Sequence, residues 1–469
     1  MAEPILAPDA PRGGRQLRAA PAAAAAPPAS PEWSALRLFG FRFALVYLLV
    51  YNLPAAASWL PATSGLIARY LDMWQVAVPW VGRHLLQLHH PIDSVPNGSG
   101  DRTFDYVQVL CIAALAMLAA LAWTALDRRR RQPRALSAGL RIYLRYTLAL
   151  ILLSQGIGKL TGARFPFPAI DRLQEPLGDS SPLALFSTFM GYSPLYTGFV
   201  GAGEALGGLL LLFRRTTTLG ALLALAVAGH AAALDFSYDV PEKLLSLHLL
   251  AMAAWLLAPD ARRLVDGLLL ERPTRPPALA PPSPSGAGSA GRWTTLGRPG
   301  HKPLLVGYAL PAITAIIVIG AILAITRHDL ERRRELMRAP RPPLYGVWDV
   351  DELVRNGRAE PPWNGDLARW RRLIVRSPEA LAVKLASGAL RSFATVYGQR
   401  AVTLLSEEGA GQPTQHGILA WSRPDPDHLV LQGTMGGDAL TMKLRRIDES
   451  NVLLLTRGFH LITDEASNQ

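Results

Sequence analysis

The sequence predicts an α-helical polytopic membrane bundle followed by an all-β C-terminal domain. Half of the 469 residues are hydrophobic, and several apolar runs approach the roughly 20 residues that a helix needs to cross a bilayer. After residue 340 these runs give way to short alternating segments broken by turn-forming dipeptides, a pattern typical of antiparallel strands. We therefore expect about seven spanning helices and then an antiparallel barrel.

The composition of each segment predicts the bounds of the N-terminal tail, the helical bundle, the linker and the spanning helices. Residues 1–33 are rich in Ala and Pro and lack the Leu-rich core of a signal peptide, which indicates a disordered cytoplasmic tail. The bundle occupies 34–258, a disordered Pro/Gly/Ser-rich cytoplasmic linker 259–303, and a plain apolar anchor 304–326. The predicted spans, of which the sixth is marginal in length, are 36–58, 105–126, 140–160, 195–213, 217–235, 243–258 and 304–326.

The net charge of +12 lies entirely before residue 340, because residues 340–469 hold 15 Lys and Arg against 15 Asp and Glu. Basic residues flank alternate loops, at 128–131, 214–215 and 262–263, as the positive-inside rule requires of cytoplasmic loops. This pattern predicts a bacterial inner-membrane protein with a cytoplasmic N-terminus and an extracytoplasmic β-domain. The arginines at 332–334 oppose that side for the domain. Nucleic acid is not an expected partner, since no basic stripe interleaves with aromatics.

The first long loop contains an amphipathic stretch, Leu66 to Leu88, that should lie on the membrane surface with Trp74 and Trp80 as interfacial anchors. The histidines that follow it, at 84, 89 and 90, match no known metal-ligand spacing. The chain has one cysteine, Cys111, which excludes internal disulfides and Cys-X-X-Cys sites. We expect no metal site.

Ionisable residues inside the spans are the best functional lead, because lipid cannot hydrogen-bond them and they must face a packed or wet interior. The candidate catalytic residues are Lys159, Glu204, His230 and His248, and the candidate substrate-binding residues are Gln155, Asp235, Asp239 and Lys243. A structural role stays open for each: Lys159 could reach the interface, Glu204 could pair with Lys159 or an arginine, and either histidine could be a core residue with one hydrogen bond. Gly156-X-Gly158 and the pair Gly203 and Gly207 predict close helix approaches beside them.

Three segments of the bundle resemble the DoxX-like membrane family, within the group of vitamin K-dependent carboxylase-like transmembrane domains. They read SQGIGKLTG (154–162), SPLYTGFVGAGEALGGLLLLFRRTTTLGALL (193–223) and DVPEKLLSLHLL (239–250). The resemblance implies a helical membrane unit linked to thiol or quinone redox systems, often as an accessory subunit. Lys159 occupies the place of a lysine that acts as a base in the carboxylase-like relatives. The lysine pair and the long luminal region of that enzyme are absent, so its activity is not carried over.

The β-domain, 340–469, should be a barrel or sandwich of about eight to ten strands. Alternating runs predict strands at 346–350, 370–375, 380–386, 401–406, 417–422, 428–433, 439–446 and 451–462. Its first strand carries Gly346 to Trp348, and Arg457 lies late in the sequence. This pair resembles the calycin, or lipocalin-like, pattern, in which a first-strand Trp packs beneath a late Arg. A ligand cavity follows only if the barrel is wide enough.

Three functions are consistent with these features, and whether the protein is an enzyme stays open. The first is a membrane redox component that binds a quinone as cofactor or substrate and exchanges electrons with a separate redox protein, since no haem, flavin or iron–sulfur motif is visible. The second is a transporter or a lipid- or small-ligand-handling protein that uses the external β-domain. The third is a non-catalytic membrane scaffold. In each case the lipid bilayer is a partner.

Overall fold

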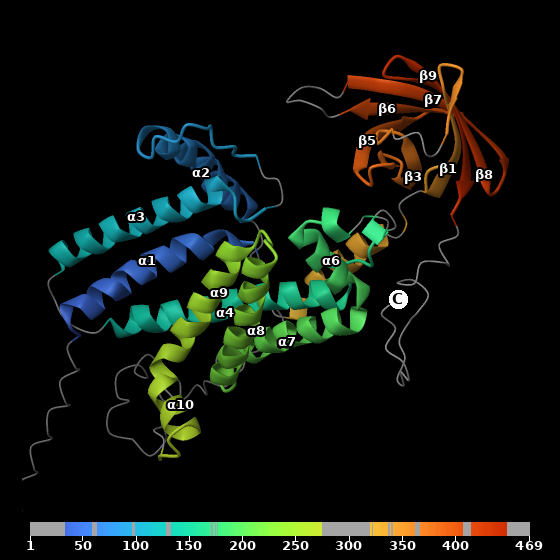
Figure 1. Cartoon of the computed structure of the whole chain (residues 1–469). Coiled ribbons are helices and arrows are strands. Elements are labelled where there is room, and N and C mark those ends of the chain that lie inside the picture. Colours follow the sequence, from blue (N-terminus) through green and yellow to red (C-terminus); the bar gives the residue numbers. More distant parts are fainter. Residues whose placement is uncertain are drawn as a thin grey trace, which may run out of the picture.

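The computed structural model describes most of the bundle and the barrel (Figure 1). The described residues are 33–58, 63–95, 99–127, 133–169, 172–173, 175, 177–273, 319–320, 322–335, 338, 341–361, 366–406 and 414–447. The strands gather in one body, orange to red in Figure 1, apart from the helices. The predicted class, a helical membrane part followed by an antiparallel barrel, is confirmed.

Six helices in the described ranges are long and apolar enough to cross a membrane, by length and composition. They are α1 (Ala35–Ala57), α3 (Thr103–Leu126), α4 (Arg134–Leu160), α7 (Pro194–Leu212), α8 (Thr217–Ser237) and α9 (Lys243–Leu257) with its continuation. The chain is therefore a multi-pass membrane protein, with six such helices rather than the seven predicted. Of the seventh predicted span, residues 304–318 lie outside the described residues. Residues 322–335 are helical, and Ile325 packs against the bundle core.

The sixth span is longer than predicted, because α9 runs on through η2 (Ala258–Asp260) into α10 (Ala261–Leu268). The prediction of a disordered linker from residue 259 is therefore wrong at its start. Residues 261–268 read ARRLVDGL, in which charged and apolar residues fall on different faces of a helix. The prediction missed this helix because the residues after it are rich in Pro, Gly and Ser. Most of the predicted linker, 274–303, lies outside the described residues.

The amphipathic stretch of the first loop is helical, as predicted, and forms α2 (Ser64–His84). Trp80 is exposed, in keeping with an interfacial anchor. The same prediction is wrong for Trp74, which is 5% exposed and clusters with Val78, Phe104 and Val107. One face of α2 packs on the first turns of α3, so the amphipathic pattern reports a protein contact as well as a surface.

The closest helix contact is between α4 and α7, and glycines make it possible. A Cβ on Gly156 would lie 2.6 Å from Gly201 O, and one on Gly208 would lie 2.7 Å from Ala149 O. The predicted approach at Gly156 is thus confirmed. The pair Gly203 and Gly207 lies against α8, where added Cβ atoms would be 3.5 Å from Val227 and 3.6 Å from Ala224 N, ordinary contact distances.

The barrel is a meander of eight antiparallel strands that closes where the first pairs with the last (β1 with β9). The strands are β1 (Gly346–Arg355), β3 (Trp370–Ser377), β4 (Ala380–Leu385), β5 (Leu390–Tyr397), β6 (Ala401–Ser406), β7 (Thr414–Asp425), β8 (His428–Met435) and β9 (Asp438–Arg446). A short ninth strand, β2 (Arg358–Glu360), extends β1 as a hairpin. The predicted strand number is confirmed, although β2 and β5 were not foreseen and the strand expected at 451–462 lies outside the described residues.

Apolar side chains from all eight barrel strands fill the interior. Trp348 is fully buried at one end, where its Nε1 donates to Leu344 O at 2.9 Å. The Arg423 guanidinium lies 5.0 Å from the centre of the Trp348 ring. Arg457, the expected calycin partner, lies outside the described residues, so the calycin likeness stays a prediction. A cavity of about 170 Å³ remains at one end of the barrel, where Leu353, Trp370 and Leu440 line it.

Candidate functional site

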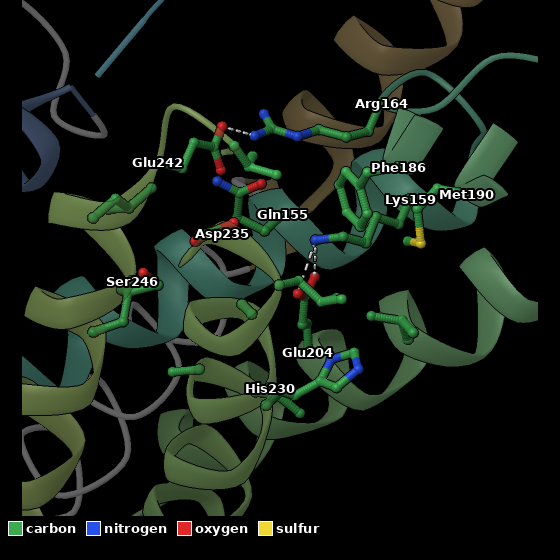
Figure 2. Close-up of a pocket in the computed structure, with 18 of the residues that line it drawn as sticks. Gln155, Lys159, Arg164, Phe186, Met190, Glu204, His230, Asp235, Glu242 and Ser246 are labelled. Atoms are coloured by element: carbon green, nitrogen blue, oxygen red, sulfur yellow. Dashed lines mark hydrogen bonds and ion pairs between the residues drawn. The ribbon is translucent and has the colours of Figure 1, made fainter. Parts of the chain in front are cut away.

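A cavity of about 230 Å³ opens at one end of the bundle. Its walls come from α4, α7, α8 and α9, from α6 (Pro182–Tyr192) and from the segment after α4 (Figure 2). The polar side chains that line it are Gln155, Lys159, Arg164, Glu204, His230, Asp235, Glu242 and Ser246. Five of the eight predicted site residues therefore meet in one cavity: Gln155, Lys159, Glu204, His230 and Asp235.

The centre of the site is an ion pair between neighbouring helices. Lys159 Nζ of α4 donates to both carboxylate oxygens of Glu204 on α7, at 2.8 and 2.7 Å (Figure 2). Both side chains are largely buried, with 12% and 7% of their surfaces exposed. The close approach of α4 and α7 at Gly156 and Gly201 brings the two groups within reach. Of the two structural partners left open for Glu204, Lys159 or an arginine, the structure shows Lys159. The pair also lines the cavity.

A second acid, Asp235, lies in the cavity wall near the end of α8 and is 7% exposed. The lining holds two basic side chains, Lys159 and Arg164, against three acidic ones, Glu204, Asp235 and Glu242. With His230 neutral, the wall therefore carries one more negative than positive formal charge. A proton or the hydrogen-bond donor of a ligand can balance that excess, which makes the site suited to proton exchange.

The cavity mouth is crossed by an ion pair between Arg164 and Glu242 (Figure 2). Arg164 follows α4 and Glu242 precedes α9, so the pair ties two chain segments 78 residues apart. About a third of each side chain is exposed. Sequence reasoning missed both residues, because they lie between helices where neither periodicity nor an apolar context singles them out. Arg164 lies two residues after the motif 154–162, and Glu242 lies within the motif 239–250, both of which carry the family resemblance.

The rest of the wall is apolar and includes Leu183, Phe186, Met190, Val200, Val227 and Leu245. Phe186 and Met190 come from α6, which packs over the site and lies between the third and fourth predicted spans. Ser181 caps α6 by accepting a hydrogen bond from Ala184 N–H, and Pro182 starts its first turn. The cavity thus has an apolar wall and, at one end, a cluster of charged side chains.

His248 was predicted as a catalytic candidate, but it lies outside this cavity, on the face of α9 that packs against α1. Its Nε2 is 2.7 Å from Tyr47 Oη and its Nδ1 is 2.6 Å from Leu244 O. The Tyr51 ring stacks on it with centroids 3.6 Å apart. A neutral ring protonated at Nδ1 satisfies both contacts, which is the structural role left open for this residue.

Asp239 and Lys243 lie beside the cavity without lining it. Lys243 Nζ pairs with Asp239 at 2.7 Å, and the Asp239 side chain is 81% exposed. Asp101, from the segment before α3, accepts hydrogen bonds from the backbone N–H groups of Lys243 and Leu244 at 2.7 and 2.9 Å. This acid therefore caps α9 from a distant part of the chain, and sequence reasoning missed it because the spacing of 142 residues leaves no local signal.

The described residues contain no group of three or more His, Cys, Asp or Glu side chains that could hold a metal ion. His89, His90 and Asp93 line a second pocket, of about 610 Å³, together with Arg102. Arg102 is already engaged there, since its guanidinium pairs with Asp105 at 3.0 Å.

Comparison with known proteins adds little to this geometry. No protein-family model and no solved structure matches the chain. Over 86 residues it is 35% identical to the uncharacterized protein YwoB of Bacillus subtilis (strain 168), a stretch that covers 18% of this chain and 55% of that protein. The chain thus spans about half the length of this curated relative, whose name assigns no activity.

Proposed function

We propose that the cavity binds the headgroup of a membrane quinone, and that the protein is a DoxX-like component of a membrane redox system. The observation that carries the proposal is the buried Lys159–Glu204 pair in the wall of an otherwise apolar cavity, with Asp235 nearby. A quinone needs an apolar ring pocket, a donor for its carbonyl oxygen and groups that exchange protons. These three features meet here.

The size of the cavity suits this ligand. At about 230 Å³ it is smaller than the roughly 300–1,000 Å³ of pockets for drug-sized molecules, so it takes one substituted ring rather than a long chain. An isoprenoid tail would extend from it into the bilayer. Reduction of a quinone to a quinol takes two electrons and two protons; a separate redox protein would supply the electrons, and Glu204 and Asp235 would pass the protons.

Binding of decylubiquinone and of a menaquinone analogue to the purified full-length protein tests the proposal. We expect Lys159→Met and His230→Ala to weaken binding at least about tenfold, a loss of ~1.4 kcal/mol. His248→Ala is the control for loss of a histidine outside the cavity; because His248 is buried whereas His230 is exposed, its folding is checked by thermal unfolding, and the folded variant should bind quinone as the wild type does. If His230→Ala binds quinone as well as the wild type and His248→Ala do, the assignment of the site is refuted. If Lys159→Met also binds as the wild type does, the helices act as a scaffold.

A lipid- or small-ligand-handling role is the second candidate, and the apolar wall formed by Phe186, Met190 and Leu245 favours it. The end of an acyl chain or a short apolar group would contact that wall, with most of a longer chain left in the bilayer, and the charges would bind a polar group of the ligand. Mass spectrometry of organic extracts of the purified protein separates the two candidates. Co-purified quinone supports the redox proposal, and co-purified lipid lost in Phe186→Ala supports the handling role.

A further inference from the structure

One polar residue of the cavity wall, His230, also lies on the outer surface of the bundle. Its side chain is exposed, and neither ring nitrogen has a hydrogen bond to a residue that the structure describes. Exposed residues follow one face of α8 at steps of seven, four, three and four: Leu219, Ala226, His230, Ala233 and Ser237. Seven residues, or about 10 Å of helix, separate His230 from the end of α8 at Ser237, so the ring lies within the apolar layer and faces lipid.

The neighbouring helix α7 places a second cavity residue opposite this histidine. The two helices pack together and are joined by residues 213–216, so they run antiparallel. A Cβ on Gly203 of α7 would lie 3.5 Å from Val227 of α8. Three residues back along α7 and three forward along α8 then bring Val200 opposite His230. Val200 lines the cavity and is partly buried, and its neighbour Phe199 is 75% exposed. The cavity therefore reaches the outer surface of the bundle between α7 and α8.

The end of the cavity farthest from this histidine is covered by charged groups. Figure 2 shows the pair of Arg164 and Glu242 at that end. The helical residues 322–335 come close enough to Arg164 to interact with it electrostatically, and Arg333 Nη1 donates to Thr161 O at the end of α4 at 2.8 Å. An apolar tail that left the cavity here would have to separate paired charges, which is costly.

We propose that the ligand enters the cavity sideways from the bilayer, between α7 and α8, and that the His230 ring binds its polar group on entry. The inference rests on the proposed function, because it takes the ligand to be a quinone with an apolar tail. An unpartnered imidazole is costly in lipid, and a neutral ring offers one donor and one acceptor. The donor fits a quinone carbonyl oxygen, and the acceptor fits a quinol hydroxyl. The headgroup then reaches Lys159 and Glu204, while the tail stays in the bilayer beside the exposed Phe199 and Leu183.

Spin labels locate the opening without any ligand. A nitroxide is attached to His230→Cys in the Cys111→Ala background, with the full-length protein in lipid vesicles. Molecular oxygen concentrates in lipid and nickel ethylenediaminediacetate stays in water, so the ratio of their collision rates with the label reports its surroundings. Ala233→Cys, on the same face of α8, and Asp239→Cys, 81% exposed beyond the helix, are the reference sites. We expect the first label to resemble that of Ala233→Cys. Resemblance to that of Asp239→Cys would mean that the ring faces water and would overturn lateral entry.

Exchange kinetics test the route itself. Val200→Phe adds bulk at the opening, and the control Leu206→Phe adds bulk at an exposed site of α7 that does not line the cavity. Fluorine NMR of a fluorinated ubiquinone analogue in nanodiscs gives the bound population and, by saturation transfer, the rate of exchange between bound and free quinone. A barrier on the route slows binding and release equally. We therefore expect Val200→Phe to slow exchange at least about tenfold at an unchanged bound population, and Leu206→Phe to match the wild type.

The outcomes separate the route from the proposed function. If the wild type binds no quinone, the proposed function fails, and the spin labels still decide whether the cavity opens to lipid. If quinone binds and Val200→Phe exchanges as fast as the wild type, the route alone is refuted. If Val200→Phe does not fold, Ala231→Leu adds bulk on the α8 side of the same opening and is judged in the same way.

Discussion

Substitution of Gly201 by Ala should separate α4 from α7 and disturb the ion pair between them. A Cβ there would lie 2.7 Å from Gly156 O and 2.8 Å from Lys159 Cβ, whereas ordinary contacts begin at 3.4 Å. The helices must therefore move apart by roughly 0.7 Å, since backbone atoms cannot rotate away as a side-chain end can. Overpacking of this kind costs about 1–3 kcal/mol.

The chain offers two matched controls on the same helix. An added Cβ meets nothing within 4 Å at Gly198, and at Gly203 it meets Val227 at 3.5 Å. Alanine is favoured over glycine in a helix by about 1 kcal/mol, so both controls should be neutral or stabilised. We therefore expect Gly201→Ala to be less stable than either control by about 1–3 kcal/mol.

Unfolding of the purified protein by heat or denaturant in one detergent measures this difference. Quinone binding provides an independent measure, because displacement of Lys159 should weaken ligand binding in Gly201→Ala and leave it intact in Gly198→Ala. If Gly201→Ala unfolds together with the two controls, the close α4–α7 contact is not present in the protein, and the geometry of the Lys159–Glu204 pair loses its support.

Three further substitutions test other parts of the structure. Asp101→Ala removes the cap of α9 and should cost about 0.5–2 kcal/mol in unfolding experiments, with Asp101→Asn milder; no loss would mean that the cap is not formed. Arg42→Met should cost about 1.5–3 kcal/mol, since the 3%-exposed Arg42 binds Asp127 at 3.1 Å; an exposed control such as Arg262→Met should cost almost nothing. Burial raises the pKa of Tyr397 to about 12, and its hydroxyl has no partner among the described residues. The wild type should therefore lose stability above pH 10, where only the unfolded tyrosine ionises, whereas Tyr397→Phe should lose less; parallel pH profiles would contradict this.

The parts of the fold that depend on composition and period could be predicted from the sequence. Hydropathy placed the spanning helices, and alternation placed most barrel strands. It failed for β5, which reads LRSFATVY and has Arg391 and Ser392 on exposed positions beside a single buried Phe. The prediction of a disordered linker from residue 259 was wrong at its start, because the Pro-rich composition further along the chain outweighed the signal of a short amphipathic helix.

The candidate site was predictable only as far as intramembrane charge allows. A charged group in a span must face a partner, so Lys159 and Glu204 could be named together. Which face of α9 meets the cavity could not be read, because every face of that helix is apolar and His248 was as plausible as Ser246. Arg164 and Glu242 needed the tertiary fold, since their contact joins segments that have no local relation.

The arrangement of α4 bears on the choice between a binding site and a transport path. Polar groups lie at both ends of its inner face, at Arg141 and at Lys159, about 27 Å apart along the helix. Between them Leu148 and Leu152 are at most 2% exposed and belong to one continuous apolar core. A polar solute that crossed this layer would lose its hydration among side chains that are mostly apolar in the described residues, which is costly. The cavity therefore fits a ligand that enters and leaves at one end, as a quinone headgroup does, better than a solute that passes through.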